Sequence, residues 1–126
     1  MKPLNVLVVD DEPGIRELMS DALSESGCVV SCAENGVEAV ARVAESHPDM
    51  VFLDIRMPRG DGITALKEIH KIWPELPVVL ITGGADPETL KNVFELGASA
   101  CLIKPFSLTD IAHMLDAYGP QLADAA

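Results

Sequence analysis

Five short apolar runs, each followed by a turn and a segment of helical periodicity, recur along this 126-residue chain. The runs cover residues 4–9, 28–32, 50–54, 77–82 and 99–104. Most of them do not alternate apolar with polar residues, which is typical of strands buried on both faces. Strands and helices that alternate over short connections form a parallel sheet with right-handed crossovers and a helix layer on each face. The pattern therefore predicts an α/β fold.

The segments between the runs carry recognisable helix signals. Pro13 suits a first helical turn, and Gly27 suits a helix end. The helical period predicts that the second helix buries Val37, Val40, Ala41 and Ala44, and that the fourth buries Leu90, Val93 and Phe94. The connections are short and no linker is evident, so we expect one domain over residues 1–126, with an ordered core at about 4–118 and a frayed tail at 119–126.

Composition narrows the class of protein. The chain is 48% hydrophobic and 23% charged, which is ordinary for a soluble globular protein. Its net charge of −11, from 9 basic and 20 acidic residues, argues against direct binding to nucleic acid or to an anionic membrane. No signal peptide is evident, and no apolar run approaches the roughly 18 residues of a membrane span. We therefore expect a cytoplasmic protein.

The cysteines and histidines show no metal-binding spacing. Cys28 and Cys32 lack the second pair that a zinc site needs. Together with Cys101, they are expected to be small, reduced core residues. The three histidines are scattered and are expected at the surface or on helix flanks.

Polar side chains that are able to bind a metal or take part in a reaction lie at four of the five strand ends. Asp10 and Asp11 follow the first run, Asp54 ends the third, Thr82 the fourth and Lys104 the fifth. The carboxyl ends of parallel strands meet at one edge of a sheet, which is where such folds gather their functional groups. Mg²⁺ prefers oxygen ligands and typically takes one or two carboxylates plus phosphate oxygens. Singly, each residue could be a helix cap or a turn former, but their joint occurrence indicates a site.

These five residues also resemble a known family. They occur with "MP" at 57–58, "DG" at 61–62, "GA" at 97–98 and "KPF" at 104–106, a combination that is similar to the receiver domain of two-component response regulators. The resemblance covers essentially the whole chain. It implies a flavodoxin-like (βα)5 fold with a five-stranded parallel sheet of order 2-1-3-4-5.

The resemblance also implies roles for these residues. Asp54 would be the phosphoacceptor, taking a phosphoryl group from a sensor histidine kinase, a histidine phosphotransfer protein or a small phosphodonor. Lys104 would neutralise the phosphoryl oxygens and Thr82 would hydrogen-bond one of them, a movement that is the family's switch. Mg²⁺ would be held by Asp11, Asp54 and the backbone carbonyl of Arg56, with Asp10 helping mainly through water. The peptide bond before Pro105 would be cis. Such a domain is not a conventional enzyme, because it takes one phosphoryl group and loses it by slow self-catalysed hydrolysis.

Two features concern how the signal is passed on. The family usually has an aromatic residue three positions before the strand-five lysine, and here that position is Cys101. Either the switch relies on the loop after Thr82, where Gly83 and Gly84 add backbone freedom, or the coupling is weaker. Arg56 and Gly84 occupy positions that tune phosphoryl lifetime in the family.

The resemblance also implies an output surface. A downstream protein target is expected on the face made by the fourth helix, fifth strand and fifth helix, which is also a candidate homodimer interface. A stand-alone regulator and a piece of a longer regulator or hybrid kinase are both open.

Three other functions are weaker alternatives. A receiver-like module that binds partners without phosphorylation would share this fold. A haloacid-dehalogenase-type phosphohydrolase generally has a second acid two residues beyond its nucleophile. After Asp54 that position is Arg56, whereas after Asp10 it is Glu12, with Asp11 intervening. A flavin or dinucleotide binder would need a glycine-rich phosphate loop after the first strand, where "DDEPG" places negative charge instead.

Overall fold

The computed structural model describes residues 3–56, 62–84 and 86–119. Five parallel strands form one sheet in the order β2-β1-β3-β4-β5. Their bounds are β1 (Asn5–Val9), β2 (Val29–Ala33), β3 (Met50–Asp54), β4 (Val78–Thr82) and β5 (Ala100–Ile103). The strand order is the one that the family resemblance implied, and each observed strand lies within one residue of its predicted bounds at both ends.

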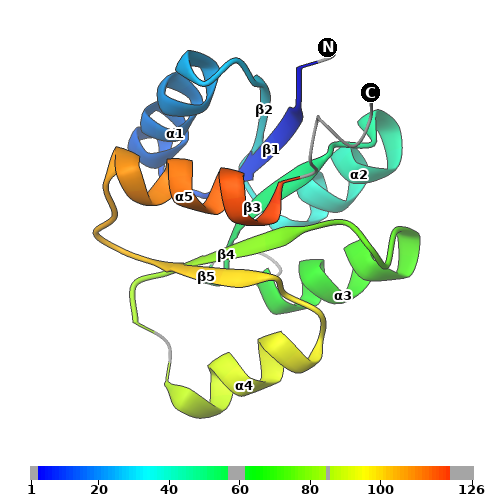
Figure 1. Ribbon diagram of the computed structural model, residues 1–126. Coiled ribbons are helices and arrows are strands. Elements are labelled where there is room, and N and C mark those ends of the chain that lie inside the picture. The colour runs from blue at the N-terminus through cyan, green and yellow to red at the C-terminus, as the bar shows by residue number, and fades with distance from the viewer. Residues whose placement is uncertain (1–2, 57–61, 85, 120–126) are drawn as a thin grey trace.

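Five helices cover the two faces of this sheet (Figure 1). Their bounds are α1 (Pro13–Glu25), α2 (Gly36–Ser46), α3 (Gly62–Ile72), α4 (Pro87–Glu95) and α5 (Leu108–Tyr118). Helices α1 and α5 lie on one face, and α2, α3 and α4 lie on the other. The predicted α/β class with helices on both faces is therefore confirmed. None of the helices in the described part of the chain has the length and apolar character that a membrane crossing needs.

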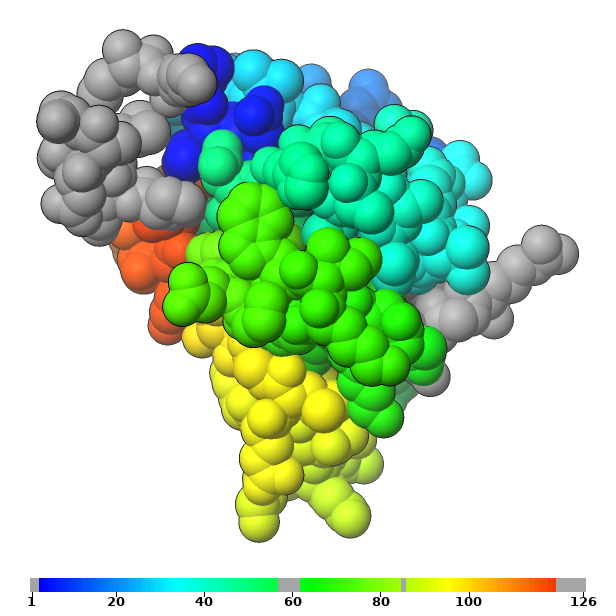
Figure 2. Space-filling model, turned by 90° about the vertical axis from the view of Figure 1, so that its right-hand side faces the viewer, coloured from blue at the N-terminus to red at the C-terminus, as the bar shows by residue number. Residues whose placement is uncertain are grey.

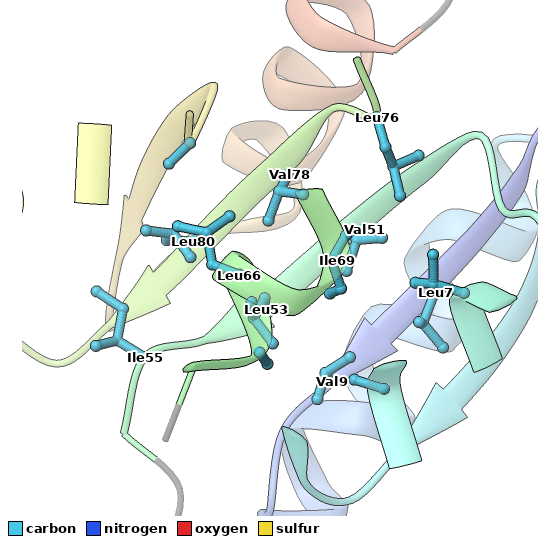
Figure 3. Close-up of a cluster of buried hydrophobic side chains, with 14 of the residues drawn as sticks. Leu7, Val9, Val51, Leu53, Ile55, Leu66, Ile69, Leu76, Val78 and Leu80 are labelled. Atoms are coloured by element: carbon cyan, nitrogen blue, oxygen red, sulfur yellow. The ribbon is translucent and has the colours of Figure 1, made fainter. Parts of the chain in front are cut away.

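The core consists of two hydrophobic layers, one on each side of the sheet. Because successive strand side chains point to opposite faces, Leu7 joins the layer beneath α2 and α3, whereas Val6 and Val8 join the layer beneath α1 and α5. In Figure 3, Leu66 and Ile69 of α3 project toward the side chains of β3 and β4. Every residue of β3 and β4 is buried, which is why their sequences do not alternate.

Helix starts follow local chemistry that the sequence contains. Asp86 caps α4 by accepting a hydrogen bond from the Thr89 N–H at 2.7 Å, and Pro87 follows as the first helical residue. Ser107 and Asp110 form a reciprocal capping box at the start of α5. These caps fix where each helix leaves the edge of the sheet.

Two helix faces were predicted only in part: Val93 is buried and Val40 packs against the core, but other residues of the predicted faces are exposed. Helix α2 buries Gly36, Ala39 and Val43, and Val37 is 74% exposed. Small residues face inward here because α2 packs against both the sheet and α3. The buried face of α2 is therefore shifted by about one residue from the predicted one. In α4 only Val93 is buried and Phe94 is 45% exposed, because this helix lies beside the edge strand β5, where Figure 2 shows it projecting from the body of the molecule.

Candidate functional site

The carboxyl ends of β1, β3, β4 and β5 bring the sequence-predicted residues to one edge of the sheet. Within the described ranges, the buried polar side chains are those of Asp10, Asp54 and Thr82. Lys104 follows β5, and its backbone N–H donates to the Thr82 carbonyl oxygen at 2.7 Å. Burial of three polar side chains at one edge of an otherwise apolar sheet marks this place as a functional site.

The same turn follows three of these strands. In each, a side-chain oxygen at the strand end accepts a hydrogen bond from the backbone N–H two residues later. Glu12 N donates to Asp10 Oδ1 at 2.9 Å, Arg56 N donates to Asp54 Oδ1 at 3.0 Å, and Gly84 N donates to Thr82 Oγ1 at 3.1 Å. One oxygen of each aspartate is thereby fixed, and the other remains for the site.

Lys104 connects the remaining carboxylate oxygens. Its Nζ lies 3.3 Å from Asp10 Oδ2, 3.3 Å from Glu12 Oε1 and 3.6 Å from Asp54 Oδ2. The buried Asp10 Oδ2 accepts no hydrogen bond within the described part of the chain, so its contact with the ammonium is an ion pair and not an aligned hydrogen bond. One ammonium among three carboxylates leaves the site negative, which favours a further cation.

The electrostatics of the site follow from burial. Loss of hydration raises the pKa of Asp54 to about 6; the Arg56 N–H and Lys104 oppose this shift, and the charges of Asp10 and Asp11 add to it. Burial also raises the pKa of Asp10, against the opposing effects of the Glu12 N–H and Lys104. Burial alone would lower the pKa of Lys104, but the carboxylates of Asp54 and Asp10 outweigh it and raise that pKa. Extra positive charge at this edge would therefore favour both ionised aspartates.

The donor set fits a hard divalent cation. Asp10, Asp11 and Glu12 each offer a carboxylate oxygen, and these oxygens lie within 4.8 Å of one another. Such oxygens, next to the unsatisfied Asp10 Oδ2, match the preference of Mg²⁺ for carboxylate ligands. Glu12 was not among the sequence-predicted site residues, although its place in "DDE" was a visible signal.

The remaining motif residues have mixed outcomes. Positions 57–58 and 61, and the predicted tail from 120 onward, lie outside the described residues. Gly62 begins α3 where a Cβ would collide with the Asp54 carbonyl, so the close approach requires glycine. The Lys104–Pro105 peptide bond is cis, as the resemblance implied.

The structure also shows a basic contact that sequence reasoning missed. Arg16 Nη1 donates to the Asp10 backbone oxygen at 2.7 Å, and Arg16 Nη2 lies 3.6 Å from Glu34 Oε1. The available signal was a lone basic residue six positions after Asp10, one helical turn into α1. Arg16 therefore binds the backbone of a residue that belongs to the acidic cluster.

The cysteines are free thiols. Cys28 is buried, whereas Cys32 and Cys101 are half-buried, so the expected core position holds fully for Cys28 alone. Cys101 pairs with Leu80 in the sheet and packs against the core layer on the α3 side. Burial raises the pKa of the Cys28 and Cys101 thiols, which favours their protonated forms.

Comparison with known proteins places this site in context. The model of the response regulator receiver domain family matches residues 6–116. The regulatory protein AtoC of Escherichia coli is 42% identical over 106 residues, which is 84% of this chain and 23% of AtoC. The probable C4-dicarboxylate response regulator DctR of Bacillus subtilis is 34% identical over 119 residues, 93% of this chain and 53% of DctR. The chain thus spans between about a quarter and a half of these curated relatives.

Solved structures agree with this result. The chemotaxis protein CheY4 of Vibrio cholerae superposes with a TM-score of 0.89 at 28% identity, covering 93% of this chain and 99% of CheY4. NtrX of Brucella abortus superposes with a TM-score of 0.87 at 36% identity, covering 93% of this chain and 27% of NtrX. Family, fold and the buried acidic edge coincide, and the chain belongs to the family of receiver domains of two-component response regulators.

Proposed function

We propose that Asp54 is the phosphoacceptor of this receiver domain and that it works with Mg²⁺. The observation that carries the proposal is the buried Asp54 carboxylate, whose Oδ2 lies 3.6 Å from the Lys104 ammonium beside an acidic cluster suited to a cation. An Asp54 oxygen forms the new P–O bond while the P–N bond of a phosphohistidine breaks, and the electron pair stays on the departing imidazole nitrogen. Receiver domains are phosphoacceptors in this sense and not classical enzymes.

The cation would be held by Asp11, Asp54 and the Arg56 backbone carbonyl, with Asp10 acting mainly through water. When bound, Mg²⁺ supplies positive charge to the phosphoryl oxygens, which phosphoryl transfer requires more than covalent help from the protein. Lys104 supplies the second positive group once it exchanges a carboxylate partner for a phosphoryl oxygen. Its ion pairs with Asp10, Glu12 and Asp54 keep the ammonium group at the site before phosphorylation.

Thr82 is the proposed link between phosphorylation and the output surface. Its Oγ1 accepts from the Gly84 N–H, and its own hydroxyl proton is still able to donate to a phosphoryl oxygen. Turning toward the phosphoryl group would strain or break the turn at Gly84, whose φ of +124° suits glycine. Cys101 has no ring to swing, so the loop between β4 and α4 carries the change. Amide chemical-shift changes confined to β1 on phosphorylation would refute this route.

The partners follow from the family. Receiver domains interact with kinases, and we propose that a histidine kinase or histidine phosphotransfer protein supplies the phosphoryl group. The proposed target surface is the α4–β5–α5 face. Each of its three elements has an exposed apolar side chain there: Phe94 in α4, Ile103 in β5 and Leu108 in α5. Exposed apolar groups of this kind favour a protein partner.

Intact mass spectrometry tests the acceptor directly. The chain is incubated with Mg²⁺ and acetyl phosphate, beside Asp54→Asn as the control. We expect one added phosphoryl group on the parent chain and none on the variant. Failure of the parent to gain mass while it still binds Mg²⁺ would support a phosphorylation-independent interaction module instead.

Arg56 provides a second test of the same site. The Arg56 backbone N–H donates a hydrogen bond to Asp54 Oδ1, and replacing the Arg56 side chain does not remove this bond. We therefore expect Arg56→Ala to accept the phosphoryl group but to lose it at a different rate, measured as decay of the phosphorylated mass. Complete failure to accept would contradict this assignment.

A further inference from the structure

Arg16 makes two polar contacts, one of them to the backbone of Asp10 in the acidic cluster. From the start of α1 its Nη1 reaches back to the Asp10 carbonyl oxygen at 2.7 Å, and its Nη2 lies 3.6 Å from Glu34 Oε1. Its side chain is only 18% exposed. A short hydrogen bond from a charged, largely buried donor is among the stronger kinds that a protein makes.

The effect of this bond is to fix the Asp10 backbone on both sides. The Asp10 N–H donates to the Ala33 carbonyl at 3.2 Å, and Arg16 holds the Asp10 carbonyl. That carbonyl belongs to the peptide group joining Asp10 to Asp11. Since this peptide plane sets the directions in which both side chains leave the backbone, fixing it fixes the relative placement of the two carboxylates.

We infer that Arg16 is a positioning residue for the cation site, holding the Asp10–Asp11 peptide so that both carboxylates are preorganised for Mg²⁺. The inference rests on the proposed function, because it assumes that Mg²⁺ binds at this edge. Groups that orient metal ligands without touching the metal commonly change its affinity by 10- to 100-fold. Arg16 acts at one remove in the same way, through the backbone of a ligand residue.

Charge and positioning predict opposite results, which makes the inference testable. As a positive charge near the site, Arg16 would repel Mg²⁺, so removing it would tighten binding. As a positioning residue it preorganises the ligands, so removing it would weaken binding. Glu34 is exposed, so its ion pair with Arg16 contributes little to the position of the guanidinium. We therefore expect Glu34→Gln to change the Mg²⁺ affinity by less than about threefold.

Isothermal titration of the chain with MgCl₂ decides between these effects. The variants are Arg16→Met, which keeps the aliphatic stem and removes the donors, and Arg16→Lys, which retains one charged donor. The matched control is Arg42→Met, since Arg42 also pairs with a glutamate at 3.6 Å, but on the exposed surface of α2. We expect Mg²⁺ affinity to fall about tenfold or more in Arg16→Met, less in Arg16→Lys, and less than twofold in Arg42→Met.

Each outcome has a defined meaning. Equal or tighter Mg²⁺ binding by folded Arg16→Met overturns the inference, even if its melting temperature falls, because the role would then be structural only. If Arg16→Met does not fold, the comparison of Arg16→Lys with the parent decides, and an unchanged dissociation constant overturns the inference. Absence of Mg²⁺ binding by the parent chain overturns the proposed metal site and this inference together, whereas failure in the variants alone concerns Arg16.

Discussion

At the scale of single residues, Asp54 is ionised where the fold disfavours its charge. Its pKa is about 6 in the folded protein, mainly because of burial, against an ordinary value of 3.8. The folded state therefore binds this proton more tightly than the unfolded state does. Stability falls as the pH rises from about 4 to about 6, and above that window the full cost is present, at most about 3 kcal/mol. The phosphoacceptor site that we propose at Asp54 is therefore less stable when no cation is bound beside it.

Replacing Asp54 by Asn should remove this cost. Without metal at pH 7.5, we expect Asp54→Asn to unfold at a higher temperature than the parent chain, because the amide mimics the protonated acid. The gain should shrink as the pH is lowered toward 5. Thermal unfolding in EDTA at both pH values measures it, with the exposed Asp21→Asn as control. A gain that is constant across this pH range would show that the ionisation of Asp54 is not its cause.

Lys104 stabilises the ionised forms of Asp10 and Asp54, whereas burial destabilises them. Replacing it by Met leaves Asp10 Oδ2 buried without its cation, and we expect a loss of about 1–3 kcal/mol at pH 7.5, since Lys104 is 21% exposed and only partly desolvated. The loss should diminish toward pH 5 as the acids take up protons. Urea unfolding measures it, and Lys71→Met, which breaks a surface pair with Glu68, should cost under about 0.5 kcal/mol. Equal losses in the two variants would contradict the role given to burial.

At the scale of secondary-structure elements, His70 fastens the end of α4 to α3. Its Nδ1 lies 3.0 Å from the Leu96 carbonyl oxygen, and its Nε2 lies 3.1 Å from that of Leu76. Gly97 follows with a φ of +103°, and a Cβ there would stand 2.8 Å from His70 Nδ1. The "GA" motif is therefore explained by contact as well as by backbone conformation. The expectation that histidines serve plain surface or helix-flank roles missed this contact.

This packing predicts a large effect for a small substitution. Gly97→Ala should destabilise the protein by about 2 kcal/mol or more, because both the left-handed φ and the collision with the His70 ring oppose a side chain. The control is Gly14→Ala in α1, where a Cβ meets nothing within 4 Å and the helix should gain about 0.5–1 kcal/mol. Chemical denaturation of both variants tests the pair. A neutral Gly97→Ala would mean that the ring moves aside at little cost.

Elements also show what the sequence was able to predict. The strands of the sheet were predictable because burial on both faces leaves an uninterrupted apolar run, as in Val78–Thr82. The inward face of α2 was not, because Gly36 and Ala39 face inward for their small size, and a stripe of larger apolar residues gives no sign of that. Arg16 was missed for a related reason. Its partner is a backbone carbonyl, and because every residue has one, the sequence does not indicate which carbonyl Arg16 binds.

At the scale of the whole molecule, the topology brings distant positions of the chain together. Periodicity predicted a parallel sheet, but the order β2-β1-β3-β4-β5 came only from the family resemblance. This order places β1 beside β3, so that Asp10 and Asp54 share Lys104, which follows β5. The strand-end residues were predictable as a group because every parallel strand ends at the same edge. Their pairwise contacts depend on strand order, which no local pattern contains.

Because that edge concentrates negative charge in a chain of net charge −11, a bound cation should stabilise the entire fold. A ligand that binds only the folded state adds RT ln(1 + [L]/Kd), which is about 1.4 kcal/mol when Mg²⁺ is present at ten times its dissociation constant. We therefore expect 10 mM MgCl₂ to raise the melting temperature more than NaCl of equal ionic strength, which only screens the general repulsion. Asp11→Asn should lose the Mg²⁺-specific part and keep the response to NaCl. If the two salts act equally on the parent chain, the acidic edge holds no cation of its own, and the stabilisation belongs to the charge of the whole molecule.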